Sequence, residues 1–191
     1  MTRKTFYYCH DLPEKQVMLQ EHMRELSEHI SHPPIEISYR FTELPKELEE
    51  GLREIFSQSD DVCCWSSDLS EFFLERQEVL CTLLVICAKE SRLAKVSLEA
   101  NSDAEWGIAV NNLAIVYGLH HKNSVWHEML HLLGADDCYD LSESDRGPNC
   151  DCPNCIMQYD ATIADVKSWP FLCDTNIQNI QKRIRGWQGE G

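Results

Sequence analysis

The sequence has no apolar segment long enough to cross a membrane as a helix. Its longest apolar run, Val79 to Ala88, has about the length of a β-strand. Residues 1–16 also lack the apolar core segment of a secretory signal peptide. We therefore expect no membrane association and a cytoplasmic location.

Basic residues are scarce as well. The chain has 17 Lys and Arg against 32 Asp and Glu, which gives a formal net charge of −15 at pH 7. A surface of this charge repels a phosphate backbone. We therefore expect no nucleic-acid partner, and a peptide or protein substrate instead.

Internal repeats and low-complexity tails are missing too, and 191 residues suffice for one domain or two small subdomains.

Cysteine, in contrast, is abundant. Six of the ten cysteines are scattered, whereas the other four crowd into one short, polar segment. That segment contains Cys138, Cys150, Cys152 and Cys155. Without an export signal, metal ligation by reduced thiols is favoured over a disulfide framework.

Apolar periodicity predicts an alternation of strands and helices. Residues 63–78 fit either a short helix or a covering loop. We expect strands at 4–9, 35–41 and 79–88, two short strands within 107–117 separated by Asn111 and Asn112, and helices at 13–30, 45–56, from Asn123 or Ser124 to Leu133, and at 174–187. This pattern predicts an α/β (α+β) fold. After Gly134 the sequence shows little apolar periodicity. This change divides the chain into an N-terminal subdomain, 1–134, and a C-terminal subdomain, 135–191.

The segment HEMLHLLGADD, residues 127–137, carries the strongest chemical signal. His127 and His131 are four residues apart, so both lie on one helix face and can bind one zinc ion. Gly134 can adopt the left-handed conformation that turns the chain back. Asp137 is then the natural third ligand, with Asp136 and Cys138 as alternatives. A chance occurrence is less plausible for this motif than for HExxH alone, because a glycine and an acidic residue follow at the required spacing.

Three protein ligands leave a fourth position for water, as is typical of catalytic zinc. Zinc lowers the pKa of such a water toward ~7, and Glu128 lies where it can act as general base. The carboxylate of Asp137 adds negative charge at the metal, which predicts modest activity or an optimum at higher pH.

The segment CIMQY, residues 155–159, strengthens this interpretation. With the HExxHxxGxxD motif it resembles the metzincin clan of zinc metallopeptidases, which have a methionine in a tight turn below the zinc. Met157 matches that methionine, and the resemblance implies that Tyr159 stabilises the oxyanion. It also implies a twisted mixed sheet with helices in the N-terminal subdomain and a small irregular C-terminal subdomain ending in a helix. The edge strand, residues 106–110, would bind the substrate by β-augmentation.

Within the clan, the chain is most similar to the archaemetzincin-like peptidases, which share Cys138 and the Cys-x-Met turn. The resemblance implies a second, structural zinc held by four cysteines. The chain departs from that pattern at Asn176, where the last cysteine is missing. One candidate set is Cys138, Cys155, Cys173 and either Cys150 or Cys152, and the other is Cys138, Cys150, Cys152 and Cys155.

Two other functions compete with a peptidase. The bacterial endoribonucleases of rRNA maturation have a similar motif, which residues 130–134 and Asp136 match. Glu128 in place of a glycine, Asp137 in place of a histidine and the acidic composition count against RNA as substrate. The remaining alternative is a zinc-stabilised interaction module with weak or no catalysis.

Overall fold

A computed structural model of the chain describes residues 4–10, 16–30, 39–75, 82–87, 107–117, 122–138, 155–157 and 172–188. In chain order the elements are β1 (Lys4–His10), α1 (Gln16–Ile30), β2 (Tyr39–Glu43), α2 (Lys46–Gln58), α3 (Val62–Glu75), β3 (Thr82–Cys87), β4 (Gly107–Val110), β5 (Leu113–Tyr117), α5 (Lys122–Leu133) and α6 (Asp174–Gln188). The predicted alternation of strands and helices is therefore confirmed.

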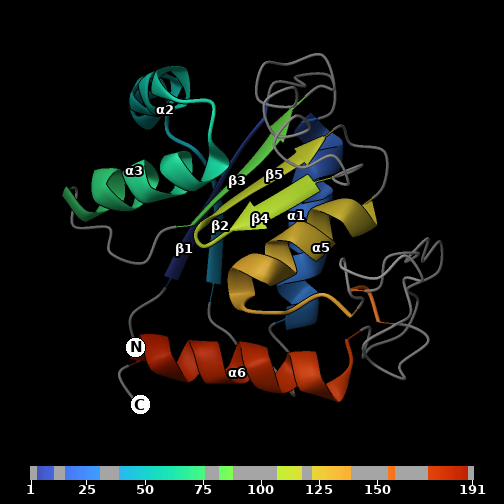
Figure 1. Cartoon of the computed structure of the whole chain (residues 1–191). Helices are drawn as coiled ribbons and strands as arrows, with labels where there is room; N and C mark the ends of the chain where they lie inside the picture. The colour runs from blue at the N-terminus through green and yellow to red at the C-terminus, as the bar shows by residue number, and fades with distance from the viewer. Residues whose placement is uncertain are drawn as a thin grey trace, which may run out of the picture.

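The five strands form one mixed sheet in the order β2-β1-β3-β5-β4. β3 is the central strand, as its apolar sequence predicts, and pairs in parallel with β1 and β5. β4 is antiparallel to β5 and forms one edge. Helices α2 and α3 cover one face of the sheet, and α1 and α5 cover the other (Figure 1). This arrangement confirms the predicted mixed α/β class.

Alternation along β5 separates two hydrophobic layers. Leu113, Ile115 and Tyr117 pack with buried residues of α2 and α3. Ala114 and Val116 pack on the opposite side with α1, α5 and α6. Successive side chains of a strand point to opposite faces, so this one strand contributes to both layers. Helix α5, which carries His127 and His131, packs on this second layer.

The helix expected at 13–30 is present as α1, which the structure describes over Gln16–Ile30. Leu19, Met23 and Leu26 are buried, as expected from their spacing. Val17, however, is 79% exposed and Met18 is 37% exposed. A helix turns by about 100° per residue, so these two side chains lie away from the face shared by the other three.

The ambiguous segment after residue 62 is a helix. Its N-terminus is stabilised because the backbone N–H of Cys63 donates a 2.8 Å hydrogen bond to Asp61 Oδ1. The helix packs Trp65, Leu69 and Phe73 into the core. It also braces the β4–β5 turn, where Asn112 Nδ2 donates to Ser70 Oγ at 3.1 Å. Asn111 adopts a positive φ of 53° in that turn, in agreement with the prediction that Asn111 and Asn112 separate two strands.

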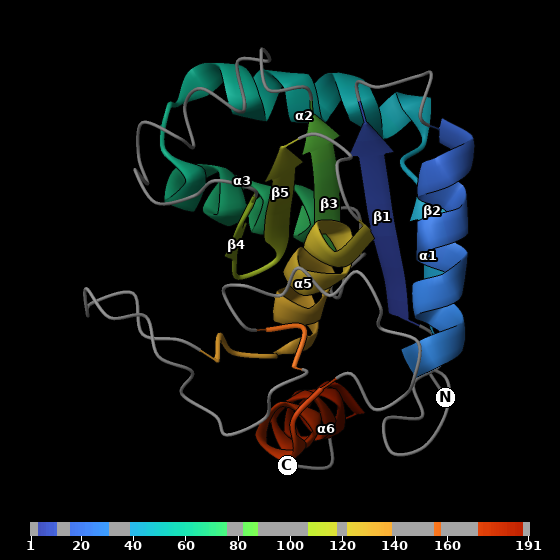
Figure 2. The same cartoon turned by 90° about the vertical axis from the view of Figure 1, so that its right-hand side faces the viewer.

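Helix α6 lies below the sheet, past the end of α5 (Figure 2). Its buried isoleucines, Ile177, Ile180 and Ile184, belong to the same hydrophobic cluster as the core residues of α5. The predicted terminal helix is thus confirmed. Among the described helices, none is long and apolar enough to span a membrane. The subdomain boundary at residue 134 and the cytoplasmic location stay predictions.

Candidate metal centre

Three side chains bring one potential metal-binding atom each to a common point. His127 and His131 lie one turn apart on α5, and their Nε2 atoms are 3.1 Å apart. Asp137 Oδ1 lies 3.2 Å from Nε2 of His127 and 3.3 Å from Nε2 of His131. Ligand atoms bound to tetrahedral zinc at ~2.0–2.1 Å are about 3.3–3.4 Å from one another. The three atoms therefore form a triangle of the size that zinc requires.

Both imidazoles are oriented by backbone carbonyl groups. His127 Nδ1 donates to the carbonyl oxygen of Ile156, and His131 Nδ1 donates to that of Ala135, each at 2.9 Å. A carbonyl oxygen can only accept, so Nδ1 carries the proton in each ring. In the neutral imidazole, Nε2 then presents its lone pair to the common point. Such a contact to the second ring nitrogen is typical of metal-binding histidines.

The turn after α5 brings Asp137 back to the two histidines. Gly134 has a φ of +102°, as predicted, and its N–H donates to His131 O at 2.9 Å. The N–H of Ala135 donates to Leu130 O at 3.0 Å. These two bonds make a Schellman motif, which ends the helix on a left-handed glycine.

The carboxylate of Asp137 faces the two imidazoles. Its Oδ1 is buried, and Nε2 of His127 and Nε2 of His131 are close polar neighbours. Burial favours a high pKa for Asp137, but His127 and His131 outweigh burial and hold this pKa well below its usual range. Asp137 therefore stays a carboxylate.

The pKa of His131 is shifted in the opposite direction to that of Asp137. Burial by itself lowers the pKa of an imidazole, but the carboxylates of Asp137 and Glu128 outweigh burial and raise the pKa of His131 to about 9. The metal-free site therefore holds a proton at neutral pH. A metal ion must displace that proton in order to bind.

Glu128 follows His127 on α5 and is buried, with 7% of its surface exposed. Its Oε2 atom has no hydrogen-bond partner among the described residues. Burial raises the pKa of Glu128, which makes the carboxylate a better proton acceptor. A buried carboxylate oxygen without a partner is rare and marks a position where a ligand or water is expected.

Asp136, the alternative third ligand, is held elsewhere. Its side chain is exposed, and Asn179 Nδ2 donates to its Oδ2 at 2.8 Å. The other alternative, Cys138, lies with the thiols described next. The geometry therefore favours Asp137 among the three candidates.

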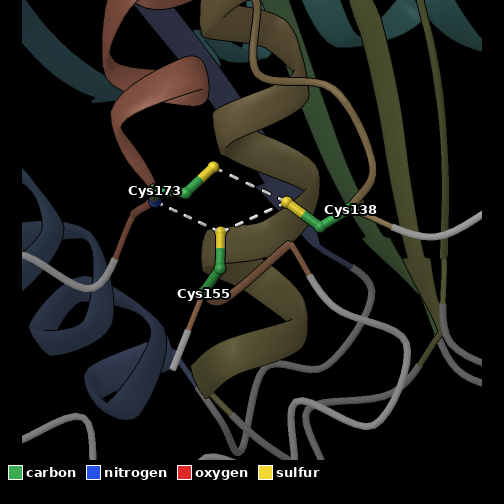
Figure 3. A group of neighbouring side chains, drawn as sticks. All are labelled: Cys138, Cys155 and Cys173. Carbon is green, nitrogen blue, oxygen red and sulfur yellow. Dashed lines mark hydrogen bonds between the residues drawn. The ribbon is translucent and has the colours of Figure 1, made fainter. Parts of the chain in front are cut away.

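A second group consists of three buried thiols, Cys138, Cys155 and Cys173 (Figure 3). The Sγ atom of Cys138 lies 3.5 Å from that of Cys155 and 3.7 Å from that of Cys173. Thiolates bound to tetrahedral zinc at ~2.3 Å have sulfur–sulfur distances of about 3.7–3.8 Å. Cys150 and Cys152 lie outside the described residues. The presence of Cys173 in the group favours the first of the two predicted cysteine sets.

Asn176 adjoins these thiols on α6, at the position of the missing cysteine. Its Nδ2 lies 3.4 Å from Cys138 Sγ, and only 2% of its surface is exposed. An N–H group faces the sulfur, so the amide is a hydrogen-bond donor there and not a fourth ligand. The sequence indicates only that a cysteine is missing at this position, and no local pattern points to a role for the asparagine.

The predicted methionine turn is present in part. Ile156 and Met157 lie in a turn, and Met157 is fully buried in the hydrophobic cluster that contains α5. This turn provides the Ile156 carbonyl that orients His127. Tyr159 lies outside the described residues, so its role stays a prediction.

No protein-family model matches the chain, and no curated protein is significantly similar to it. Among solved structures, the chain is similar to archaemetzincin from Methanopyrus kandleri, with 13% sequence identity and a TM-score of 0.44. The similarity covers 96% of each chain. Similarity at this level does not assign the chain to a family or an activity.

Proposed function

We propose that this protein is a zinc-dependent peptidase, with His127, His131 and Asp137 as zinc ligands. The triangle of three donor atoms with sides of 3.1, 3.2 and 3.3 Å is the observation that carries the proposal. A zinc ion held there supplies a Lewis acid that lowers the pKa of a water molecule and polarises a carbonyl group.

The role of Glu128 in this proposal is proton transfer. Its buried carboxylate, whose Oε2 has no hydrogen-bond partner among the described residues, lies next to His127 in the chain, and burial raises its pKa, which favours proton uptake. Glu128 takes a proton from water as the peptide carbonyl is attacked. It then gives this proton to the leaving nitrogen as the C–N bond breaks.

The edge strand β4 supports a peptide substrate. It pairs with β5 on one side only, so the backbone groups along its other edge have no strand partner among the described residues. An extended peptide can pair with such an edge by β-augmentation. Gly107, the first residue of β4, contacts Glu128 so closely that an added Cβ would lie 2.6 Å from Oε1. A peptide along β4 would therefore pass beside the proton acceptor.

We also propose that Cys138, Cys155 and Cys173 bind a second, structural zinc ion. Their spacing supports this, and so does their order in the chain: Cys138 and Cys155 flank the polar segment 139–154, and Cys173 directly precedes α6. Either Cys150 or Cys152 would supply the fourth thiolate. Such an ion would hold together a segment with few apolar residues.

The test of the main proposal compares E128Q with wild type on a library of unstructured peptides, with zinc content measured in both. We expect peptide cleavage to fall about 10²–10⁴-fold in E128Q while zinc stays bound. E50Q is the matched control, since Glu50 is exposed on α2. Cleavage of RNA but not peptides would support a ribonuclease instead. No turnover of either substrate by the zinc-loaded wild type would indicate an interaction module.

A further inference from the structure

We infer that Asn176 is a positioning residue, which holds the backbone of Asp136 so that the next residue, Asp137, faces His127 and His131. The inference rests on the proposed function, because it takes Asp137 as the third zinc ligand. It adds a role for a residue of α6 that contacts no substrate and binds no metal.

Two hydrogen bonds join the Asn176 side chain to the backbone of one residue. The N–H of Asp136 donates to Asn176 Oδ1 at 2.7 Å, and Asn176 Nδ2 donates to Asp136 O at 2.9 Å. A backbone N–H can only donate, so the orientation of the amide is fixed by its partner. With only 2% of the Asn176 surface exposed, water has little access to compete for either bond.

These two bonds determine the direction in which Asp137 leaves the turn. The carbonyl of Asp136 belongs to the same planar peptide unit as the N–H of Asp137. Fixing that carbonyl therefore fixes the plane from which Asp137 extends. On the far side, the N–H of Cys138 donates to Met157 O at 2.8 Å. Asp137 is thus held from both sides, with its carboxylate toward the histidines.

Asn179, one turn further along α6, assists in a different way. Its Nδ2 donates to the carboxylate of Asp136 at 2.8 Å. This bond holds the Asp136 carboxylate against α6, away from His127 and His131. It is more exposed to solvent than the bonds of Asn176, so we expect it to contribute less.

A cysteine could not replace Asn176 in this role. The amide provides an acceptor for Asp136 N–H and donors for both Asp136 O and Cys138 Sγ, whereas a thiol has one weak donor and one weak acceptor. The asparagine at this place in the sequence therefore links the thiol group to the turn that carries Asp137.

The test measures the affinity of the full-length protein for Co²⁺ by absorption. Thiolate charge-transfer bands appear only when Co²⁺ binds the cysteines, so ligand-field absorption without these bands reports the histidine–aspartate site. We expect N176A to bind Co²⁺ at the histidine site about 10–100-fold more weakly than wild type, as is usual when the partner of a metal ligand is removed. E50Q, which changes an exposed residue of α2, is the control and should bind Co²⁺ at this site as wild type does.

The decisive comparison is a double-mutant cycle with D137A. If Asn176 acts through Asp137, N176A should have no further effect in the D137A background. An equal loss of affinity in both backgrounds would show a general structural role and overturn the inference, as would wild-type affinity in N176A. Unchanged affinity in D137A alone would instead refute Asp137 as a ligand, and thus the proposed function.

A near-isosteric variant covers the case in which N176A does not fold. N176D keeps the acceptor for Asp136 N–H and loses the donor to Asp136 O. Its added negative charge should by itself favour a cation, so a loss of affinity would report lost positioning. We expect N176D to bind Co²⁺ at least threefold more weakly than wild type, and wild-type affinity would overturn the inference.

Discussion

Gly107 lies so close to the carboxyl group of Glu128 that no other residue fits without moving it. A Cβ built on Gly107 would lie 2.6 Å from Oε1 of Glu128 and 2.8 Å from its Cδ. Both distances are well below van der Waals contact. A side chain at the first residue of the edge strand would therefore require the proposed proton acceptor to shift.

The first prediction is that G107A reduces catalysis and leaves zinc binding intact. The new methyl group must displace the Glu128 carboxylate, and a misplacement of about 1 Å can reduce a rate about 10²-fold. The ligands on α5 and in the following turn are not touched. Steady-state peptide hydrolysis and zinc content measure the two effects separately.

G186A is the matched control, because a Cβ at Gly186 on α6 meets nothing within 4 Å. It should keep full activity and stabilise the helix by roughly 0.5–1 kcal/mol. If G107A and G186A had the same activity, Glu128 would not need its present position.

The second prediction concerns the turn at Gly134. Its φ of +102° is strained for any residue with a β-carbon. An added Cβ would also lie 2.6 Å from Cδ of Arg183, although this flexible and exposed side chain can move. We expect G134A to lower the free energy of unfolding by about 1–3 kcal/mol. Urea denaturation of the metal-free protein measures this loss.

The double variant G134A/R183A separates the two causes. Removing the Arg183 side chain relieves the contact and not the backbone strain, so most of the loss should persist. Full recovery of stability in the double variant would show that the contact, and not the backbone conformation, requires glycine.

The third prediction is a proton-linked zinc site. The folded, metal-free protein raises the pKa of His131 from 6.5 to about 9. Charged His131 therefore contributes stability that is fully present below pH 6.5 and is lost as the pH rises through 9. Zinc must displace this proton, so its affinity should increase with pH up to about 9.

NMR titration of the metal-free protein tests this directly. D137N should lower the pKa of His131, because it removes the negative charge beside the ring. A His131 that titrates near 6.5 in the wild-type protein would contradict the arrangement of the site.

The fourth prediction concerns the cluster of three thiols, Cys138, Cys155 and Cys173. C173S should lose a tightly bound zinc ion and lower the melting temperature, because a cross-link between α6 and the preceding turn is lost. C63S is the control, since Cys63 is exposed on α3. Zinc content and thermal unfolding would be measured in both variants. Equal zinc content in C173S and C63S would remove Cys173 from the metal site.

The parts of the site that depend on residues close together in the sequence could be predicted. His127 and His131 are one helical turn apart, so their shared face follows from helix geometry alone. The left-handed turn at Gly134 could likewise be predicted from the residue type. In the fold, the apolar run that contains β3 indicated the central strand. Each of these inferences depends on residues within one short segment.

Contacts between residues far apart in the sequence could not be predicted from such local patterns. Asp136 and Asp137 are neighbours of the same type, and the contacts that distinguish them come from Asn176 and Asn179, 40 and 43 positions along the chain from Asp136. The pairing of Gly107 with Glu128 likewise joins an edge strand to a helix. No local pattern distinguishes such a glycine from one in an ordinary turn.

An anomalous difference map at the zinc edge, from crystals of the zinc-loaded protein, tests the central claim most directly. We predict a peak about 2.0–2.2 Å from Nε2 of His127, Nε2 of His131 and Oδ1 of Asp137. A peak that contacts Asp136 instead of Asp137, or no peak between the two histidines, would contradict the account.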